Sequence, residues 1–384
     1  MEAYLDNAAT TKVREEVVQA MVEMFEQDYG NPSSLHRMGL IVEKKIKKAR
    51  KDIADYLKVM PDEIYFTSGG TEGNNIALQG IINKFGKNKK HLITTEIEHA
   101  SVKNIFKYYE TQGYEVSYLK VDRNGYVDIE QLKEIIREDT AVVSIMMVNN
   151  ETGAIQPVKE IAKWLRANSK AKIHIDGIQA IGKIPVDLSN LDVDAFTFSG
   201  HKFHGPKGIG GMYLKKGLNI NAPYKGSGQE HGMRPGTENV PGIVGLATAL
   251  NCIKQDEKNY RDHLQNLKIR LVEKFKENLD DFVVNSSLDE SGAPHIINIT
   301  FKGIKGEVFL HYLENANIYV STGAACSSKN KGGSHVLKAM KLNLEEIDSS
   351  IRMSFSKYNT IEEIDYAVVE MSKVVKEIRK IMKR

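Results

Sequence analysis

The stretch KIHIDGIQAIGKIPVDLSNLDVDAFTFSGHKFHGPKG (172–208) decides how the chain folds. It contains two short runs rich in β-branched and aromatic residues, KIHID (172–176) and AFTFSG (195–200), joined by a longer connection. The first run ends in Asp176, and the second leads straight to Lys202. Successive apolar strands that each end in polar residues are typical of a parallel sheet, which binds its ligands at the carboxyl ends of its strands.

Five more runs of the same kind lie on either side of this stretch. The segments between runs carry apolar residues at helical spacing, as Ile129, Leu132, Ile135 and Ile136 do. This alternation predicts the α/β class, with a mainly parallel seven-stranded sheet covered by helices on both faces. The five runs are EIYFTS (63–68), HLITTE (91–96), VSYLKV (116–121), AVVSIMMV (141–148) and GGMYLK (210–215).

The pattern changes in the last third of the chain. A long polar helical stretch (254–279) precedes three more strand-like runs with helices between them. This arrangement predicts a smaller α+β domain, which the first dozen or so residues complete. The three runs are IINITFKG (296–303), NIYVST (317–322) and SIRMSFS (350–356).

The length of 384 residues also favours two domains over one. We expect residues 15–254 to form a large domain, and residues 1–14 with 255–384 to form the small one. The net charge is only +3, which is too weak a field to indicate nucleic-acid binding. A helical run of basic residues, Lys44 to Lys51, is predicted to be a solvated helix face rather than a basic patch for an acidic partner.

The chain ends and the cysteines indicate a cellular setting. The first residues carry acids and few apolar residues, unlike a secretory signal, and no apolar run is long enough to span a bilayer. The two cysteines, Cys252 and Cys326, make neither a disulfide framework nor a zinc motif. A reducing cytoplasm is therefore the expected location, with no permanent metal site.

Three features together predict a site for pyridoxal phosphate. FTSGGTEGNN (66–75) runs from a strand into a helix, and Gly70 and Thr71 could bind a phosphate there. Lys202, at a strand end, could form a Schiff base, and Asp176 could pair with a pyridinium nitrogen. Taken singly, each has an ordinary alternative: a strand–helix turn, a surface lysine and a helix-capping aspartate.

Cys326 lies in STGAACSSKNKGGS (321–334), a stretch of small, polar and glycine residues. Such a loop is expected to be mobile and exposed, and Lys329 and Lys331 would favour the thiolate. Cys326 is therefore predicted to be a nucleophile. Cys252, in an apolar helical stretch, is predicted to be a small buried cysteine.

Motifs along nearly the whole chain make the sequence resemble the cysteine desulfurases, in the class V aminotransferase group of fold-type I pyridoxal-phosphate enzymes. They occur in the order expected for that group. They are LDNAATT (5–11), YGNPSSLH (29–36), TSGGTEGNN (67–75), EIEHASV (96–102), NNETGAIQP (149–157), HIDGIQ (174–179), SGHKFHGPKG (199–208), GMRPGTEN (232–239), STGAACSS (321–328) and IRMSFSKYNT (351–360).

The resemblance implies roles for individual residues around the cofactor. Lys202 would hold pyridoxal 5'-phosphate as a Schiff base and move the Cα proton, while Asp176 would pair with the ring nitrogen. His99 would stack on the ring and help as an acid–base group, although a histidine at such a turn is usually a capping residue. The phosphate would be bound by Gly70, Thr71, Ser199 and His201.

The resemblance also implies contacts with the substrate and with a second subunit. Gln179 and Asn150 would contact the side of the ring that carries the phenolic oxygen, and Asn150 would also face the substrate. Arg352 would bind the substrate carboxylate through a bidentate fork, the alternative being a surface ion pair. Thr237 would reach the phosphate of the neighbouring subunit, which implies a homodimer.

The implied reaction converts L-cysteine to L-alanine, with the sulfur carried as a persulfide on Cys326. The implied acceptors are an iron–sulfur scaffold protein or a tRNA-thiolating enzyme, and Cys326 would at most ligate a cluster transiently. A selenocysteine lyase or another enzyme of the class V group is the alternative activity. A sulfur-carrier protein without catalysis is the alternative outside enzymology.

Three positions depart from the usual wording of the group's motifs. His231 stands where an arginine is common, and Pro235 where a small hydroxylic residue is common. Both affect the phosphate contact expected of Thr237. Gly177 replaces a usual alanine directly after Asp176.

Overall fold

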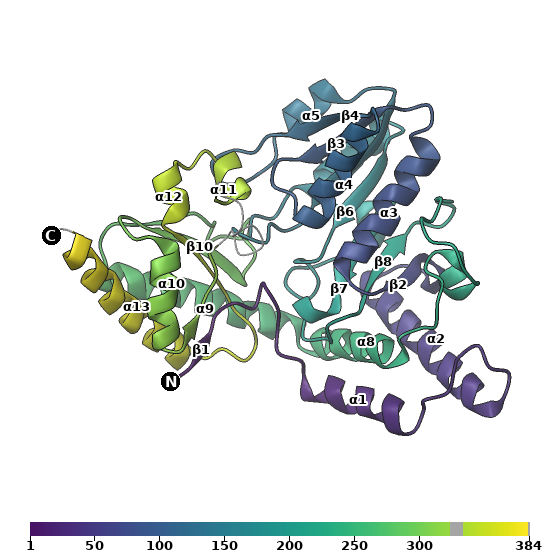
Figure 1. Cartoon of the computed structure of the whole chain (residues 1–384), viewed down its shortest axis with the longest axis horizontal. Helices are drawn as coiled ribbons and strands as arrows, with labels where there is room; N and C mark the ends of the chain where they lie inside the picture. Colours follow the sequence, from purple (N-terminus) through teal and green to yellow (C-terminus); the bar gives the residue numbers. More distant parts are fainter. Residues whose placement is uncertain (323–332, 383–384) are drawn as a thin grey trace.

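A computed structural model describes residues 1–322 and 333–382 of the chain, which fold into two lobes (Figure 1). The large lobe is built on a seven-stranded sheet in the order β2-β8-β7-β6-β5-β3-β4. All neighbours pair in parallel except β8, which is antiparallel to β2 and β7, so the predicted sheet is confirmed. The strands are β2 (Ile64–Thr67), β3 (His91–Thr95), β4 (Glu115–Leu119), β5 (Thr140–Met146), β6 (Lys172–Asp176), β7 (Ala195–Ser199) and β8 (Gly210–Leu214).

Helices cover both faces of this sheet, so its central strands are apolar on both sides. Because successive side chains point to opposite faces, Leu92 and Val142 join one hydrophobic cluster while Ile93 and Val143 join another. The helices of the large lobe are α1 (Glu15–Glu26), α2 (Arg37–Leu57), α3 (Gly70–Phe85), α4 (Ala100–Thr111), α5 (Ile129–Ile135), α6 (Val158–Asn168), α7 (Leu188–Leu191) and α8 (Val240–Gln255). Short 3-10 turns span Pro61–Glu63, Gly200–Lys202 and Gln229–Gly232.

The small lobe is built on an antiparallel sheet in the order β12-β10-β9. Its own hydrophobic core includes Phe275, Phe301 and Phe309, whose rings meet edge to face. The strands and helices are β9 (Phe282–Val284), β10 (Ile296–Phe301), β12 (Ser350–Ser354), α9 (Glu257–Asn278), α10 (Gly306–Asn315), α11 (His335–Ala339), α12 (Leu344–Asp348) and α13 (Ile361–Met382). Strand β9 was not expected from the sequence, because three residues are too few to show an alternation.

The first residues of the chain complete the small lobe. Strand β1 (Ala3–Tyr4) pairs in parallel with β11 (Ile318–Tyr319), and Asp6 forms a bridge with Ser354. The chain then passes to the large lobe, where the Thr11 amide donates to the His201 carbonyl at 2.9 Å. The predicted domain limits, 14/15 and 254/255, stay a prediction.

Two expectations, one about a helix and one about a cysteine, need correction. The polar helix expected over 254–279 is interrupted at Asp256, where α8 ends and α9 begins. Cys252 is half-buried rather than buried. Separately, side chains of the α11 and α12 region, including Val336, pack in the large lobe's core although they follow small-lobe strands in sequence. No helix in the ranges that the structure describes has the length and apolar character needed to cross a membrane.

The basic run in α2 is mostly a solvated face, as predicted, with one exception. Lys48 and Lys51 are exposed and pair with carboxylates four residues on. Arg50 turns inward instead and pairs with Glu230 through two hydrogen bonds of 2.9 and 2.6 Å. The Glu230 carboxylate also accepts the Phe66 amide at 2.8 Å. Helix α2 is thus joined to the edge of the sheet by a buried ion pair.

We expect Glu230→Ala to lower the free energy of unfolding by about 3 to 5 kcal/mol, because it leaves the buried charge of Arg50 without its carboxylate and the Phe66 amide without its acceptor. Urea unfolding of the variant measures this loss. Asp55→Ala, which removes an exposed partner of Lys51, is the control and should cost about 1 kcal/mol at most. Equal losses in both variants would contradict a special role for the buried pair.

Candidate active site

Lys202 lies where the sequence predicts it, directly after the carboxyl end of β7 on a 3-10 turn. Its side chain is half-buried. The Nζ atom donates to the carbonyl oxygens of Ala8 and Ala9, at 2.6 and 2.9 Å. The N-terminal segment thus positions this amine at the junction of the two lobes.

Asp176 ends the neighbouring strand β6 and is only 4% exposed. One carboxylate oxygen accepts the Ile178 amide at 3.0 Å, and the other accepts the Asn74 side-chain amide at 2.9 Å. Burial raises the pKa of this carboxyl, while these hydrogen bonds and the nearby His99 and Lys202 act against the increase. The backbone contact expected of a capping aspartate is present, since Asp176 accepts the Ile178 amide. The carboxylate also accepts from the Asn74 side chain inside the site, so capping is not its sole contact among the described residues.

Asn74 is a site residue that the sequence reasoning missed. It is fully buried in α3, and its amide nitrogen donates both to Asp176 and to the Ser101 hydroxyl, each at 2.9 Å. The Thr197 hydroxyl of β7 donates to its amide oxygen at 2.5 Å. Asn74 therefore fixes the orientation of the Asp176 carboxylate. Its place one turn after the glycines of α3, on the face toward the sheet, was the available signal.

His99 acts as the N-cap of α4, as the capping alternative required. Its Nδ1 accepts the Ser101 amide at 3.1 Å, so a neutral ring carries its proton on Nε2. Burial lowers the pKa of His99, and the charge of Lys202 lowers it further, whereas Asp176 raises it. Capping thus sets the tautomer and leaves Nε2 as a donor.

Gln179 and Asn150 are placed on the small-lobe side of the site. The Gln179 amide donates to the Ala8 carbonyl at 3.0 Å and accepts from His295 Nε2 at 3.3 Å. His295, which precedes β10, is fully buried, and burial holds its pKa well below the usual value. The backbone carbonyl of Asn150 accepts from Arg352 at 3.0 Å. His295 was not predicted, because a histidine outside any motif gives no signal.

The expected phosphate residues gather around one cavity of about 440 Å³. Gly70 is the first residue of α3, so free backbone N–H groups of the helix start face this space. A Cβ on Gly70 would lie 2.1 Å from the end of the Ile178 side chain, so a larger residue there would require that side chain to move. The cavity's lining includes Thr10, Gly69, Gly70, Thr71, Glu72, Ser199, His201 and Lys207.

Two groups in this lining bear on its charge. Burial lowers the pKa of His201 to about 4, so the ring is neutral near pH 7. The Glu72 carboxylate would repel an anion, but it accepts the Ser68 amide at 2.5 Å and lies 3.4 Å from the Arg234 guanidinium. These contacts offset its charge, and the rim as a whole suits a phosphate.

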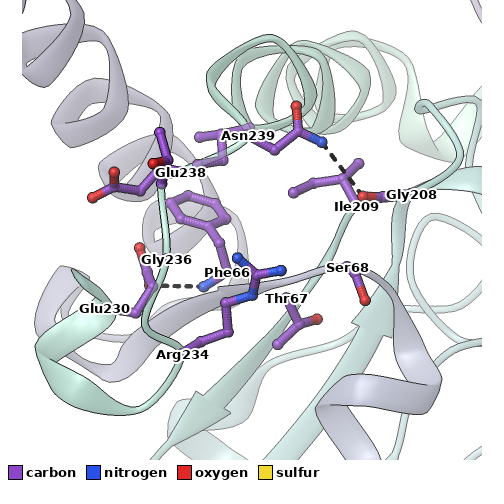
Figure 2. Close-up of a pocket in the computed structure, with 12 residues that line it drawn as sticks. Phe66, Thr67, Ser68, Gly208, Ile209, Glu230, Arg234, Gly236, Glu238 and Asn239 are labelled. Carbon is purple, nitrogen blue, oxygen red and sulfur yellow. Dashed lines mark hydrogen bonds between the residues drawn. The ribbon is translucent and has the colours of Figure 1, made fainter. Parts of the chain in front are cut away.

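Thr237 lines a second cavity, of about 140 Å³, which shares Ser68 and Gly208 with the first. Figure 2 shows Arg234 reaching toward its centre, while Asn239 donates to the Gly208 carbonyl at 3.4 Å. Thr237 itself is exposed. The structure therefore places Thr237 next to the cavity expected to hold the phosphate in the same chain, and its contact with a neighbouring subunit stays a prediction.

Arg352 lies on β12 and is only 6% exposed. Its guanidinium pairs with the Asp6 carboxylate at 2.6 Å, so the ion pair considered as an alternative exists, but it is buried rather than on the surface. The Nε atom is buried without a hydrogen-bond partner among the described residues. A guanidinium with an unused N–H donor can bind a further carboxylate by donating to it.

Cys326 lies outside the described residues, which resume at Gly333. Both neighbouring ends are fixed beside the site. Ser321 exchanges two backbone hydrogen bonds with Arg352, of 3.1 and 2.7 Å, and Ser334 donates through its hydroxyl to the Glu151 carboxylate. Burial raises the pKa of Glu151 to about 7.

Glu98 is a second buried carboxyl that the sequence reasoning missed. It accepts the Thr95 hydroxyl and the Met146 amide, each at 2.8 Å. Burial and the neighbouring Asp176 raise its pKa to about 8, so Glu98 is protonated near pH 7. It therefore adds no second negative charge beside Asp176.

The residues present fit pyridoxal phosphate. The buried Asp176 carboxylate, the helix start at Gly70 and the amine of Lys202 would meet the ring nitrogen, the phosphate and the aldehyde carbon of that group. The three lie on adjoining elements, α3, β6 and β7, at one edge of the sheet. Lys202 is close enough to Asp176 for its charge to lower the pKa of the carboxyl group.

Comparisons with known proteins agree with the motifs. The family model for class V aminotransferases matches residues 3–367. The cysteine desulfurase IscS of Methanosarcina thermophila is 42% identical over 98% of this chain and 92% of that protein. The cysteine desulfurase IscS of Dictyoglomus turgidum is 38% identical over 99% and 96%.

Solved structures show the same likeness. A NifS-like protein superposes with a TM-score of 0.92 at 39% identity, covering 98% of this chain and all of that one. A structure described as SspA in complex with cysteine superposes with a TM-score of 0.81 at 32% identity, covering 93% and 100%. The likeness extends over both lobes.

The glycine after Asp176 has a structural reason. A Cβ on Gly177 would lie 1.8 Å from the ring of Phe196, which is fully buried on β7. The Phe196 ring therefore fills the space that an alanine side chain would need. This departure from the usual motif is a packing exchange between neighbouring strands.

We expect Gly177→Ala to destabilise the protein by about 1 to 3 kcal/mol, because the added methyl group overpacks the Phe196 site. The second change Phe196→Leu should restore much of the loss. Thermal unfolding of the single and double variants measures both effects. Gly228→Ala, whose added Cβ has no neighbour within 4 Å, is the control. A Gly177→Ala protein as stable as the wild type would contradict this explanation.

Proposed function

Since the chain belongs to the class V aminotransferase family and, within it, to the cysteine desulfurases, we propose that Lys202, Asp176 and His99 carry out this activity with pyridoxal phosphate and L-cysteine. One observation carries the assignment. An amine, a buried carboxylate and an imidazole from three different elements converge beside a cavity that suits a phosphate. A sulfur carrier without catalysis has no need for this set.

The cofactor would be held at its two ends by the large lobe. Gly70, Thr71, Ser199 and His201 would bind its phosphate, and Asp176 would accept a hydrogen bond from its ring nitrogen. When bound, pyridoxal phosphate supplies an electron sink that weakens the bonds at the substrate's α and β carbons. Asn74 and the Ile178 amide hold the Asp176 carboxylate in one orientation. From there it would stabilise the protonated ring nitrogen, on which the electron sink depends.

Lys202 would move the proton of the substrate's Cα. Its amine is held by two carbonyl oxygens of the N-terminal segment, which fix its position without neutralising it. His99 would face the ring. Its Nδ1 accepts the Ser101 amide, so the proton of the neutral imidazole is on Nε2. Because burial keeps this imidazole neutral, it can donate a hydrogen bond without placing a second positive charge beside Lys202.

Arg352 would bind the substrate carboxylate. In the structure it pairs with Asp6 and with the Asn150 carbonyl, and its Nε has no partner among the residues that the structure describes. An incoming carboxylate would compete with Asp6 for the guanidinium and draw on the same fork of donors. Asn150 would lie near the substrate because its backbone carbonyl accepts a hydrogen bond from Arg352.

Cys326 would collect the sulfur. Its thiolate attacks the sulfur of the bound cysteine, an S–S bond forms, and the C–S bond breaks. The bonding pair stays with the carbon, which takes up a proton and becomes the methyl group of alanine. Support comes from the chain on either side, because Ser321 is bonded to Arg352 and Ser334 to Glu151, next to Asn150.

We infer a homodimer from the surface of α1 and α2, at the end of the molecule away from the small lobe (Figure 1). Large apolar side chains are exposed there, and such patches mark protein interfaces. Thr237 would then reach the partner's phosphate. The exposed residues are Val18, Val22, Phe25, Tyr29, Leu35, Met38 and Leu40.

The sulfur acceptor, either an iron–sulfur scaffold protein or a tRNA-thiolating enzyme, is also part of this proposal, as is the cytoplasmic location. The selenocysteine lyase alternative is not favoured, because the named relatives that we compare are cysteine desulfurases.

Lys202→Ala should remove the borohydride-reducible link between protein and cofactor and lower alanine formation by about 100-fold or more, because both the tether and the proton-moving amine are lost. Mass spectrometry of the reduced protein and an alanine assay measure the two effects. Lys163→Ala changes an exposed lysine of α6 and should leave both unchanged. A link that survives in Lys202→Ala would move the Schiff base to another lysine.

Cys326→Ala should abolish sulfide release and persulfide formation while the yellow cofactor adduct remains, because only the sulfur acceptor is removed. Persulfide-specific labelling and the absorption spectrum report on the two parts separately. Cys252→Ala removes the other cysteine and should keep full activity. Full activity of Cys326→Ala would refute the nucleophile assignment without affecting that of Lys202.

A further inference from the structure

A third cavity, of about 220 Å³, lies where the two lobes meet, away from the cofactor site. Its walls come from the start of α1, the connection between α8 and α9, and the segment between β12 and α13. It is therefore formed by both lobes and by the chain that joins them. It is lined by Arg14, Ile253, Asp256, Asn259, Tyr260, His263 and Lys357.

Arg14 is the central observation. It is only 7% exposed, and among the described residues its guanidinium forms no ion pair with a carboxylate within 4.0 Å. Its Nε is buried without a hydrogen-bond partner there, and its side-chain contact is the thiol of Cys252, a weak acceptor. A guanidinium is charged in proteins, so the described residues hold a buried positive charge without a carboxylate in direct contact.

Lys183 adds a second positive group behind the wall of the cavity. It is 2% exposed, and its amine donates to the Tyr260 hydroxyl. Burial and the charge of Arg14 lower the pKa of Lys183 to about 7. A positive charge on Lys183 beside that of Arg14 is therefore costly, and an anion between the two groups would offset this cost.

The start of α9 supplies donors to the same cavity. Its N-cap, Asp256, makes no side-chain hydrogen bond to the helix backbone, so the first N–H groups lack a side-chain cap. The Asp256 carboxylate is exposed at the rim and accepts the Asn259 amide at 2.6 Å. His263 donates through Nε2 to the Asn359 carbonyl at 3.0 Å. Asp256 is the single carboxylate in the described lining.

We propose that this cavity is a binding site for a small oxyanion of the inorganic phosphate class, held by Arg14, Lys357 and the start of α9. A guanidinium fork matches two oxygens of such an anion, and a helix start favours negative charge. The volume of 220 Å³ is enough for a phosphate with bridging water but not for a nucleotide.

Such an anion would clamp the two lobes together. Arg14 is the N-cap of α1, and its amide donates to the His204 carbonyl of the large lobe at 3.2 Å, whereas Lys357 and the body of α9 belong to the small lobe. The Tyr260 hydroxyl that meets Lys183 also lies 3.2 Å from His204 Nε2, and His204 is two residues from Lys202. The occupied cavity would thus hold the two lobes together close to Lys202.

Thermal unfolding of the cofactor-loaded enzyme in inorganic phosphate, against chloride at equal ionic strength, tests this proposal. The loaded enzyme is used because its cofactor already fills the other phosphate site. We expect the melting temperature to rise with phosphate concentration and to saturate, and isothermal titration should give a defined affinity. No rise above that in chloride would overturn the proposal.

Two variants assign the effect to the cavity. Arg14→Gln should weaken phosphate affinity at least tenfold, and Lys357→Gln, which changes an exposed residue and leaves folding intact, should weaken it about threefold or more. Lys163→Gln is the control for loss of a positive charge and should bind as the wild type does. Unchanged affinity in both Arg14→Gln and Lys357→Gln would place the phosphate elsewhere and overturn the proposal. The cofactor's absorption band, unchanged in all three, separates this result from a failure of the catalytic assignment.

Discussion

The structure depends above all on a buried carboxylate held in one orientation. Asp176 sits at the end of a central strand, and two hydrogen bonds, from Asn74 and from the Ile178 amide, fix both of its oxygens. A charge in so dry a place is expensive, and the protonated Glu98 nearby avoids adding another. Under the proposed function, a cationic cofactor ring would pair with this carboxylate. Asn74 of α3 and the turn after β6 keep the carboxylate in position for that contact.

The N-terminal segment turns this strand edge into a site. Its Ala8 carbonyl accepts from both Lys202 and Gln179, and Asp6 binds Arg352 of the small lobe. Residues far apart in sequence thus share a few backbone oxygens of one short segment. Because both lobes contact this segment, the position of Lys202 in the large lobe is fixed relative to that of Arg352 in the small lobe. The same contacts therefore pack the lobes together and position the candidate catalytic residues.

One departure from the usual motifs has a packing reason, because the buried ring of Phe196 fills the space that a Cβ at Gly177 would need. The turn that carries His231 is held by the neighbouring residue Glu230, which pairs with Arg50 of α2. Residues outside the site thus position the segments that carry these two departures. Arg14 belongs to another kind of case, since its buried charge has no partner carboxylate in the described chain and so indicates a ligand.

The sequence by itself determined the sheet, its seven strands and the strand-end positions of Asp176 and Lys202, because strand periodicity and local motifs are short-range signals. It also suggested Cys326, whose surroundings lie outside the described residues. Only the tertiary structure decided that Asn74 orients Asp176 and that Arg352 is buried against Asp6. These contacts join residues separated by about a hundred to several hundred positions, and burial or hydrogen bonding at such separations leaves no periodic trace in the chain.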